Sequence, residues 1–178
     1  MTTHPAKVEI LLRLLTLADV AEIGHWPAYP AEFAELDYAL RQDGWIAEFQ
    51  NKPGTCLYGA EQSGQLVALA ILAMSAPGES EFRIAIHPDQ VGKGLGKQIT
   101  RLVLAQGFHQ GGLLRIHLLV RKNHPRAINL YQKMNFNFSG ECSKYINHRV
   151  TDFYQMEIWR RDYLAIPDRE EIGSGSII

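Results

Sequence analysis

Three glycines, Gly92, Gly94 and Gly96, occupy alternate positions in the stretch IHPDQVGKGLGKQI, which joins an apolar segment to an expected helix. Glycine has no β-carbon to cover the backbone N–H groups, and exposed amides at the start of a helix bind anionic oxygens. Positive charge follows on one side of the helix start. It comes from three residues spaced by four, Lys93, Lys97 and Arg101. The pattern predicts a site for a phosphate-rich ligand.

Two common phosphate-binding motifs do not fit this stretch. A Walker loop needs GxxxxGK and then Ser or Thr, but Val91 stands at the first glycine and Gln98 follows the lysine. A dinucleotide fingerprint, GxGxxG, would place its third glycine at Lys97. What remains is an irregular glycine nest. The residues alone also allow a flexible turn with a solvated basic face.

Composition limits the class of protein. The 178 residues, 46% hydrophobic and 21% charged, suit one domain with a sizeable core. A net charge of −1 predicts no nucleic-acid partner and no anionic membrane surface. Cys56 and Cys142 stand in no disulfide or metal spacing, so we expect no metal site and a cytoplasmic location. Residues 1–15 lack the features of a signal peptide, and no apolar run is long enough to span a membrane.

Strands and helices alternate along the chain. Thr16 is suited to cap a helix over 17–24, and Pro30 to open a second helix that ends at Gly44. The glycine stretch leads into a helix ending near 106–112, and a further helix over 125–134 ends at Asn135, which tolerates left-handed backbone. The expected strands are 9–15, 55–61, 66–74, 81–86, 113–120, 136–146 and 151–159.

These elements predict an α/β fold. Strand 81–86, the helix after it and strand 113–120 form a unit whose two strands run parallel. The remaining strands follow one another through short turns, as in antiparallel pairs. We therefore expect a mixed, mostly antiparallel sheet of about seven strands with helices on both faces. The domain covers 1–160, and 161–178 forms a tail whose Gly/Ser-containing end is expected to be disordered.

Two segments resemble known motifs. EFRIAIHPDQVGKGLGKQI resembles the acetyl-CoA-binding motif of the GNAT superfamily of N-acetyltransferases, in which Q/R-x-x-G-x-G/A follows the fourth strand and holds the CoA pyrophosphate. NHPRAINLYQKMNF is similar to the family's N-x-x-A-x-x-L-Y-x-x-x-G-F segment, and the residues in register are Ala127, Leu130, Tyr131 and Phe136. The resemblance covers about Val8 to Trp159 and looks closest to the branch of polyamine and ribosomal-protein N-terminal acetyltransferases. It implies an N-acetyltransferase that uses acetyl-CoA as co-substrate.

The resemblance implies a set of cofactor-binding residues. In the family the fourth strand splays from the fifth, which would free amides near Ile84 and Ile86 for the thioester and pantetheine arm. Val91 stands where the family has Gln or Arg, so binding there would rely on backbone amides. His124 stands at the family's asparagine, with Asn123 one position earlier, so either His124 substitutes or the backbone shifts. The full set is Ile84, Ile86, Val91, Gly92, Lys93, Gly94, Leu95, Gly96, Lys97, Asn123 and His124.

Catalytic groups follow from the same resemblance. Tyr131 matches the family's general acid, and a phenol with a pKa of about 10 can protonate a departing thiolate at neutral pH. The alternative is a packing residue of an amphipathic helix. Glu81, which we expect at the start of the fourth strand on the face of Arg83 and Ala85, is the first choice for general base, unless it only pairs with Arg83 or solvent. His117 is a second choice, although a lone histidine in a strand is more often structural.

The acceptor site is less defined. In the family the first two helices and the loop before the last strand line it, which implies Trp26, Tyr29 and Asp152 here. Aromatic and acidic groups suit a cationic amine, so we expect a small cationic molecule or a peptide amine as acceptor. The alternatives are a non-catalytic, regulatory CoA-binding module and a transferase for a longer acyl-CoA. Relatives are often dimers, so a homodimer is possible.

Overall fold

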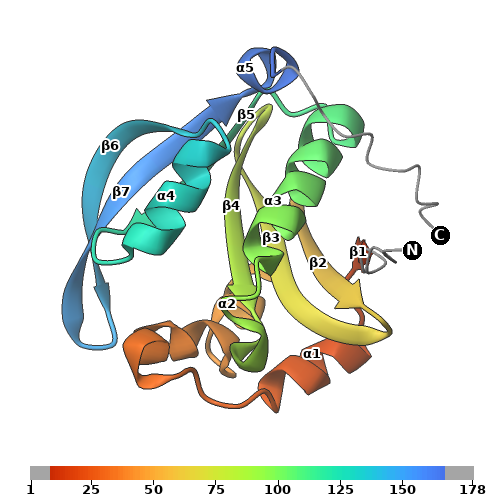
Figure 1. The fold of residues 1–178 in the computed structure, drawn as a ribbon, viewed down its shortest axis with the longest axis vertical. Helices are drawn as coiled ribbons and strands as arrows, with labels where there is room; N and C mark the ends of the chain where they lie inside the picture. Colours follow the sequence, from red (N-terminus) through yellow and green to blue (C-terminus); the bar gives the residue numbers. More distant parts are fainter. Residues whose placement is uncertain (1–8, 167–178) are drawn as a thin grey trace, which may run out of the picture.

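The computed structural model describes residues 9–166 and contains one seven-stranded sheet in the order β1-β2-β3-β4-β5-β7-β6 (Figure 1). All neighbouring strands are antiparallel except β4 and β5, which are parallel. The predicted mixed sheet is thus confirmed, including the parallel pair that flanks the helix after the glycines. The strands are β1 Ile10–Leu14, β2 Thr55–Gln62, β3 Gln65–Ala76, β4 Glu79–Ile86, β5 Arg115–Arg121, β6 Asn137–Ile146 and β7 Arg149–Trp159.

Helices cover both faces of the sheet, as expected, and each face has its own apolar core. One face carries α1 (Leu17–Gly24), the 3₁₀ helix η1 (Ala31–Leu40) and α2 (Trp45–Phe49). The opposite face carries α3 (Leu95–Ala105) and α4 (Pro125–Lys133), which lie in front of the sheet in Figure 1, together with the short helices that follow α3 and β7. These short helices are the π-helical η3 (Gln106–Gln110) and α5 (Arg160–Leu164), and a short 3₁₀ turn, η2 (Pro88–Gln90), precedes α3.

Local sequence signals fix two helix ends where they were predicted. Thr16 caps α1: its hydroxyl accepts from the Asp19 N–H at 3.2 Å, and the Asp19 carboxylate accepts from the Thr16 N–H at 2.7 Å. Asn135 follows α4 with φ +64°, the left-handed conformation that ends a helix. Capping residues therefore set these boundaries through hydrogen bonds local to the chain.

The segment from Pro30 to Gly44 differs from the expected α-helix. It forms the 3₁₀ helix η1, followed by the unpredicted α2. Asp37 accepts the Tyr29 N–H at 3.2 Å and binds Arg41 at 2.7 Å, so both ends of η1 are tied to one side chain. At Gly44 a β-carbon would lie 2.3 Å from the Tyr38 carbonyl oxygen, so the chain turns there as only glycine permits. These contacts between neighbouring turns override the helical spacing of the apolar residues.

The parallel ladder between β4 and β5 is short. It pairs only Glu79–Glu81 with Arg115–His117, and beyond the Glu81–His117 pair the two strands separate. Since β4 begins at Glu79, Glu81 is its third residue rather than its first, as the sequence had suggested. The point of separation defines an opening in the middle of the sheet, toward the carboxyl ends of both strands.

Residues after β7 continue the domain as α5. The Tyr163 ring lies 4.7 Å from that of Phe108, so α5 packs on the same core as α3. The end of the tail, expected to be disordered, lies outside the described residues. Within residues 9–166 no helix is long and apolar enough to cross a membrane, and no three His, Cys, Asp or Glu side chains gather as metal ligands would.

Candidate active site

Backbone amides of β4 face the opening between β4 and β5. The His87 N–H donates to the Val67 carbonyl of β3 at 2.8 Å, so amides at every second residue of β4 point toward β3. The amides of Ile84 and Ile86 alternate with these and point toward β5, beyond the last β4–β5 pair. An extended ligand arm lying in the opening would meet these donors as it would meet a neighbouring strand.

The glycine loop lies between η2 and α3, past the carboxyl end of β4. Gly92 has φ +86° and Gly94 φ +80°, and Gly94 is the N-cap of α3 without a side-chain cap. The first-turn amides of α3, on Leu95, Gly96 and Lys97, are therefore available to an anionic ligand. The left-handed backbone at both glycines turns the loop sharply and keeps β-carbons away from it.

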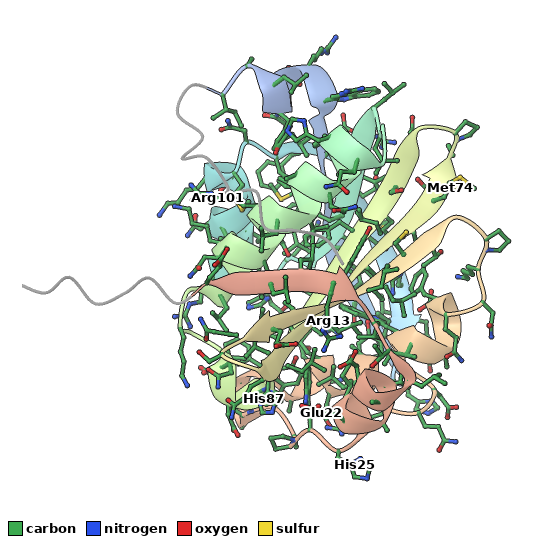
Figure 2. All side chains as sticks on the ribbon, turned by 90° about the vertical axis from the view of Figure 1, so that its right-hand side faces the viewer. Arg13, Glu22, His25, Met74, His87 and Arg101 are labelled. Carbon is green, nitrogen blue, oxygen red and sulfur yellow. The ribbon has the colours of Figure 1, made fainter. Side chains whose placement is uncertain are left out.

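Two loop residues expected to bind the cofactor also have contacts within the protein. The Val91 side chain packs against the core beneath η1 and α2, and its N–H donates to the Pro88 carbonyl at 3.4 Å. Lys93 lies before the helix rather than on it, and its Nζ donates to Gln90 Oε1 at 3.0 Å. Lys97 lies in the first turn of α3, and Arg101 extends from α3 into solvent (Figure 2).

Arg126 is a cation that the sequence interpretation missed. It lies in the first turn of α4, and its Nη2 is 3.5 Å from the position that a β-carbon would take on Gly92. Its guanidinium group thus lies next to the glycine loop. Its place among the variable positions of the NHPRAINLY segment gave no signal, because only the approach of α4 to the loop brings it there.

Asn123 and His124 contact η1. The Asn123 amide donates to Glu35 Oε1 at 3.1 Å, and the His124 ring centroid lies 5.5 Å from that of Phe33. Burial lowers the pKa of His124, and its side chain does not cap α4. Arg121 reinforces this junction: only 6% exposed, it forms an ion pair with Glu35 at 3.0 Å. These residues fasten η1 to the carboxyl end of β5.

Tyr131 lies on the α3–α4 side of the sheet. Its side chain is 8% exposed, and its ring makes edge contacts with Phe82, at 6.5 Å between centroids, and Phe136, at 5.5 Å. Burial raises the pKa of Tyr131, so the phenol is protonated at neutral pH. Among the described residues its hydroxyl has no hydrogen-bond partner. Because Phe82 follows Glu81 in β4, Tyr131 lies at the level where β4 and β5 separate.

Glu81 lies on the opposite face, at the same level. Successive strand residues point to opposite faces, so Glu81 points away from the core that contains Phe82. Its carboxylate accepts from Arg83 Nε at 2.8 Å, and Arg83 also binds Glu48 at 3.2 Å and lies 4.5 Å from the Phe49 ring centroid. The expected alternative of a pair with Arg83 is therefore present, and it holds the carboxylate in one place.

The three residues expected to bind the acceptor are not brought together. Trp26 and Tyr29 are only 5% and 7% exposed and belong to the core beneath η1 and α2. The Tyr29 hydroxyl donates to the Ile86 carbonyl at 2.6 Å, which connects the segment before η1 to the end of β4. Asp152 lies on β7, where its carboxylate accepts from Ser143 Oγ at 2.6 Å.

A cavity of about 360 Å³ lies between η1, the end of β5 and the start of β7. Its lining carries both signs of charge, because acidic groups from η1 and β7 face basic groups after β5 and in β7. It is lined by Glu35, Lys122, Asn123, Arg149, Val150, Thr151 and Asp152. Of the predicted acceptor residues, this cavity includes Asp152 alone.

Sequence comparisons agree with this architecture. Residues 20–136 match the family model described as the acetyltransferase (GNAT) family. The chain is 34% identical over 88 residues to spermidine N(1)-acetyltransferase of Escherichia coli, an alignment that covers 48% of this chain and 47% of that protein. It is 31% identical over 139 residues to the N-alpha-acetyltransferase RimI of Mycobacterium tuberculosis, covering 72% and 84% of the two chains. The chain thus spans about half the length of the spermidine acetyltransferases that it matches.

Solved structures share the fold. The crystal structure of spermidine N-acetyltransferase from Vibrio cholerae in complex with CoA and spermine superimposes with a TM-score of 0.73. The superposition covers 87% of this chain and 98% of that one at 23% sequence identity. At this identity the likeness establishes the arrangement of strands and helices and nothing of the acceptor.

Proposed function

Because the chain belongs to the acetyltransferase (GNAT) family, we propose that it transfers an acetyl group from acetyl-CoA to a primary amine. The observation that carries this proposal is the alignment of three features along β4. A loop with free amides and nearby cations lies beyond the carboxyl end of β4. Moving back along β4 from this loop, one meets first the amides of Ile86 and Ile84, which point into the opening, and then the point where β4 and β5 separate. This order matches the pyrophosphate, the pantetheine arm and the thioester of acetyl-CoA.

In this proposal the pyrophosphate binds the amides at the start of α3, with Lys97 and Arg126 adding charge. The arm then runs antiparallel to β4 toward the opening. The amides of Ile86 and Ile84 hydrogen-bond it as a neighbouring strand would. The thioester carbonyl reaches the point where β4 and β5 separate, and there the Ile84 amide, the first beyond the ladder, stabilises the oxyanion that forms when an amine attacks.

Acid and base lie on opposite faces of the opening. Tyr131, on the α3–α4 face, donates its phenolic proton to the departing thiolate, and the proton that the attacking nitrogen loses as the amide forms restores the phenol by way of water. Glu81, on the η1–α2 face, takes a proton from the acceptor ammonium, directly or through water, so that a neutral amine attacks. The two faces keep the acid near the sulfur and the base near the nitrogen.

The proposed acceptor is a primary amine of a small cationic molecule or of a peptide. These two classes of acceptor are motivated by two relatives, one named for spermidine and the other for N-alpha-acetylation. Within the cavity described above, Glu35 and Asp152 favour an ammonium group, whereas Lys122 and Arg149 suit an acceptor that also carries acidic or carbonyl groups. The cavity therefore accommodates a peptide amine at least as well as a polyamine.

The test is an acetyl-transfer assay that follows thiol release with a panel of polyamines and peptides. Saturable, amine-dependent release is expected with at least one class. Acetyl-CoA binding without transfer to any amine would favour the non-catalytic module instead. The proposal includes a cytoplasmic setting, in keeping with the free thiols of Cys56 and Cys142. It also includes a homodimer, which sedimentation velocity tests.

A further inference from the structure

His117 lies at the point where β4 and β5 separate. It is paired with Glu81 in the last position of the parallel ladder, and both side chains point to the η1–α2 face, away from the core that contains Phe82 and Leu118. His117 Nε2 lies 2.8 Å from the hydroxyl of Ser75. Ser75 occupies an irregular position of β3, so its side chain reaches across β4 and is exposed to solvent.

The carboxylates around His117 already have arginine partners. Arg115 binds Glu79, the closest contact of the group, and Glu157 at 2.7 Å. Glu81 is held by Arg83, as described above. In the part of the chain that the structure describes, the second ring nitrogen of His117 has no partner. The imidazole is thus held through Nε2, and in the tautomer that carries its proton on Nε2 this N–H donates to Ser75 Oγ and leaves Nδ1 to accept a proton.

Burial lowers the pKa of His117, and the positive charge of Arg115 lowers it further. Glu81, Glu79 and Glu157 act in the opposite direction but do not outweigh burial. His117 is therefore neutral at neutral pH and able to accept a proton. An imidazolium ion formed there would be unstable relative to one in water, so it would release its proton readily to a route that reaches solvent.

We propose that His117 and Ser75 carry the acceptor's proton from Glu81 to solvent. This proposal rests on the proposed function. The acceptor ammonium gives its proton to the Glu81 carboxylate, which passes it to the free nitrogen of His117. The imidazolium then releases a proton from Nε2 through the Ser75 hydroxyl to water. In the balance, the ammonium and acetyl-CoA yield the acetamide, the CoA thiol and one proton, which is the proton that this route removes.

The test compares four variants with the wild type, and Ser75→Ala is one of them. His117→Gln keeps a side chain that can bond to Ser75 but carries no proton, His117→Ala leaves room for added imidazole, and His25→Gln is a control at an exposed histidine of the α1 end. Rates are measured against pH, with acetyl-CoA affinity measured by calorimetry for each variant.

We expect His117→Gln to lower kcat about 100-fold at pH 7 and to remove the acidic limb of the pH profile, with acetyl-CoA affinity unchanged. Imidazole should restore part of the rate of His117→Ala, and His25→Gln should match the wild type. Ser75→Ala, which shortens the route by one group, should lower kcat several-fold.

Two outcomes would overturn the relay but leave the proposed function standing. In the first, the wild type is active and the His117→Gln variant keeps its rate at every pH. In the second, the His117 variants lose rate and acetyl-CoA affinity equally, and imidazole does not restore the rate. An inactive wild type would remove the proposed function and this route with it. Titration of His117 by NMR is a further check independent of turnover, since a pKa at or above the ordinary value of about 6.5 would contradict the relay.

Discussion

Replacing Tyr131 with phenylalanine removes a single oxygen atom. The ring contacts with Phe82 and Phe136 remain, and the hydroxyl has no partner among the described residues, so the free energy of unfolding should change by less than about 0.5 kcal/mol. The thiolate, in contrast, loses its proton donor. General acid catalysis contributes about 10²- to 10⁴-fold, so kcat should fall by at least 100-fold, or about 3 kcal/mol in the barrier.

Three measurements follow this substitution: thiol release at saturating substrates, calorimetry with acetyl-CoA and chemical unfolding. Acetyl-CoA affinity should stay within twofold of the wild type. Tyr58→Phe is the matched control, because Tyr58 is buried in the same core but on β2, and its rate should not change. Equal losses of rate and affinity, or an unfolding free energy lower by more than 1 kcal/mol, would mean that Tyr131 supports the fold and not the reaction.

Further predictions concern the loop and the edge of the sheet. Gly94→Ala, at φ +80°, should lower the unfolding free energy by about 1–2 kcal/mol and weaken acetyl-CoA binding. The control Gly64→Ala, at φ +78° in an open turn, should lower the unfolding free energy similarly but leave acetyl-CoA binding unchanged. Equal acetyl-CoA affinities in the two variants would place the ligand elsewhere. Arg126→Met should weaken acetyl-CoA binding about tenfold, and more at low salt, while an unchanged affinity would remove Arg126 from the site. Arg13 holds the pKa of Asp19 at about 2, below its ordinary 3.8. This pair therefore stabilises the protein above pH 3.8 by about 2 kcal/mol, and the contribution is lost as the pH falls toward 2. In the Asp19→Asn variant the free energy of unfolding should therefore depend less on pH between about pH 2 and 4 than in the wild type. An unchanged pH dependence would contradict this assignment.

Much of the fold followed from local signals in the sequence. Thr16 and Asn135 mark helix ends through their own hydrogen bonds and backbone preference, so the predicted boundaries agree with the structure. Strand periodicity located all seven strands, and the connection through α3 required a parallel pair. The prediction for the segment around Asp37 was wrong in helix type, because its 3₁₀ geometry depends on hydrogen bonds to Tyr29 and Arg41 that the spacing of apolar residues does not reveal.

The site was predictable only where residues are close in the chain. The glycines at the start of α3 are such a case. Trp26 and Tyr29 have aromatic side chains of the kind that suits a cationic acceptor, but in the structure both are buried and pack in the core. Their burial was not visible in the sequence. Arg126 and Ser75 gave no signal, since each reaches its neighbour only through the approach of elements distant in sequence, Gly92 in one case and His117 in the other.

The central claim is that the loop before α3 and the opening between β4 and β5 form one acetyl-CoA site. Isothermal titration calorimetry with acetyl-CoA, and separately with NAD and ATP, tests it most directly. The account predicts micromolar binding of acetyl-CoA and at least 100-fold weaker binding of the other two, because only acetyl-CoA has an arm to fill the opening. No binding of acetyl-CoA, or equal binding of all three, would contradict it.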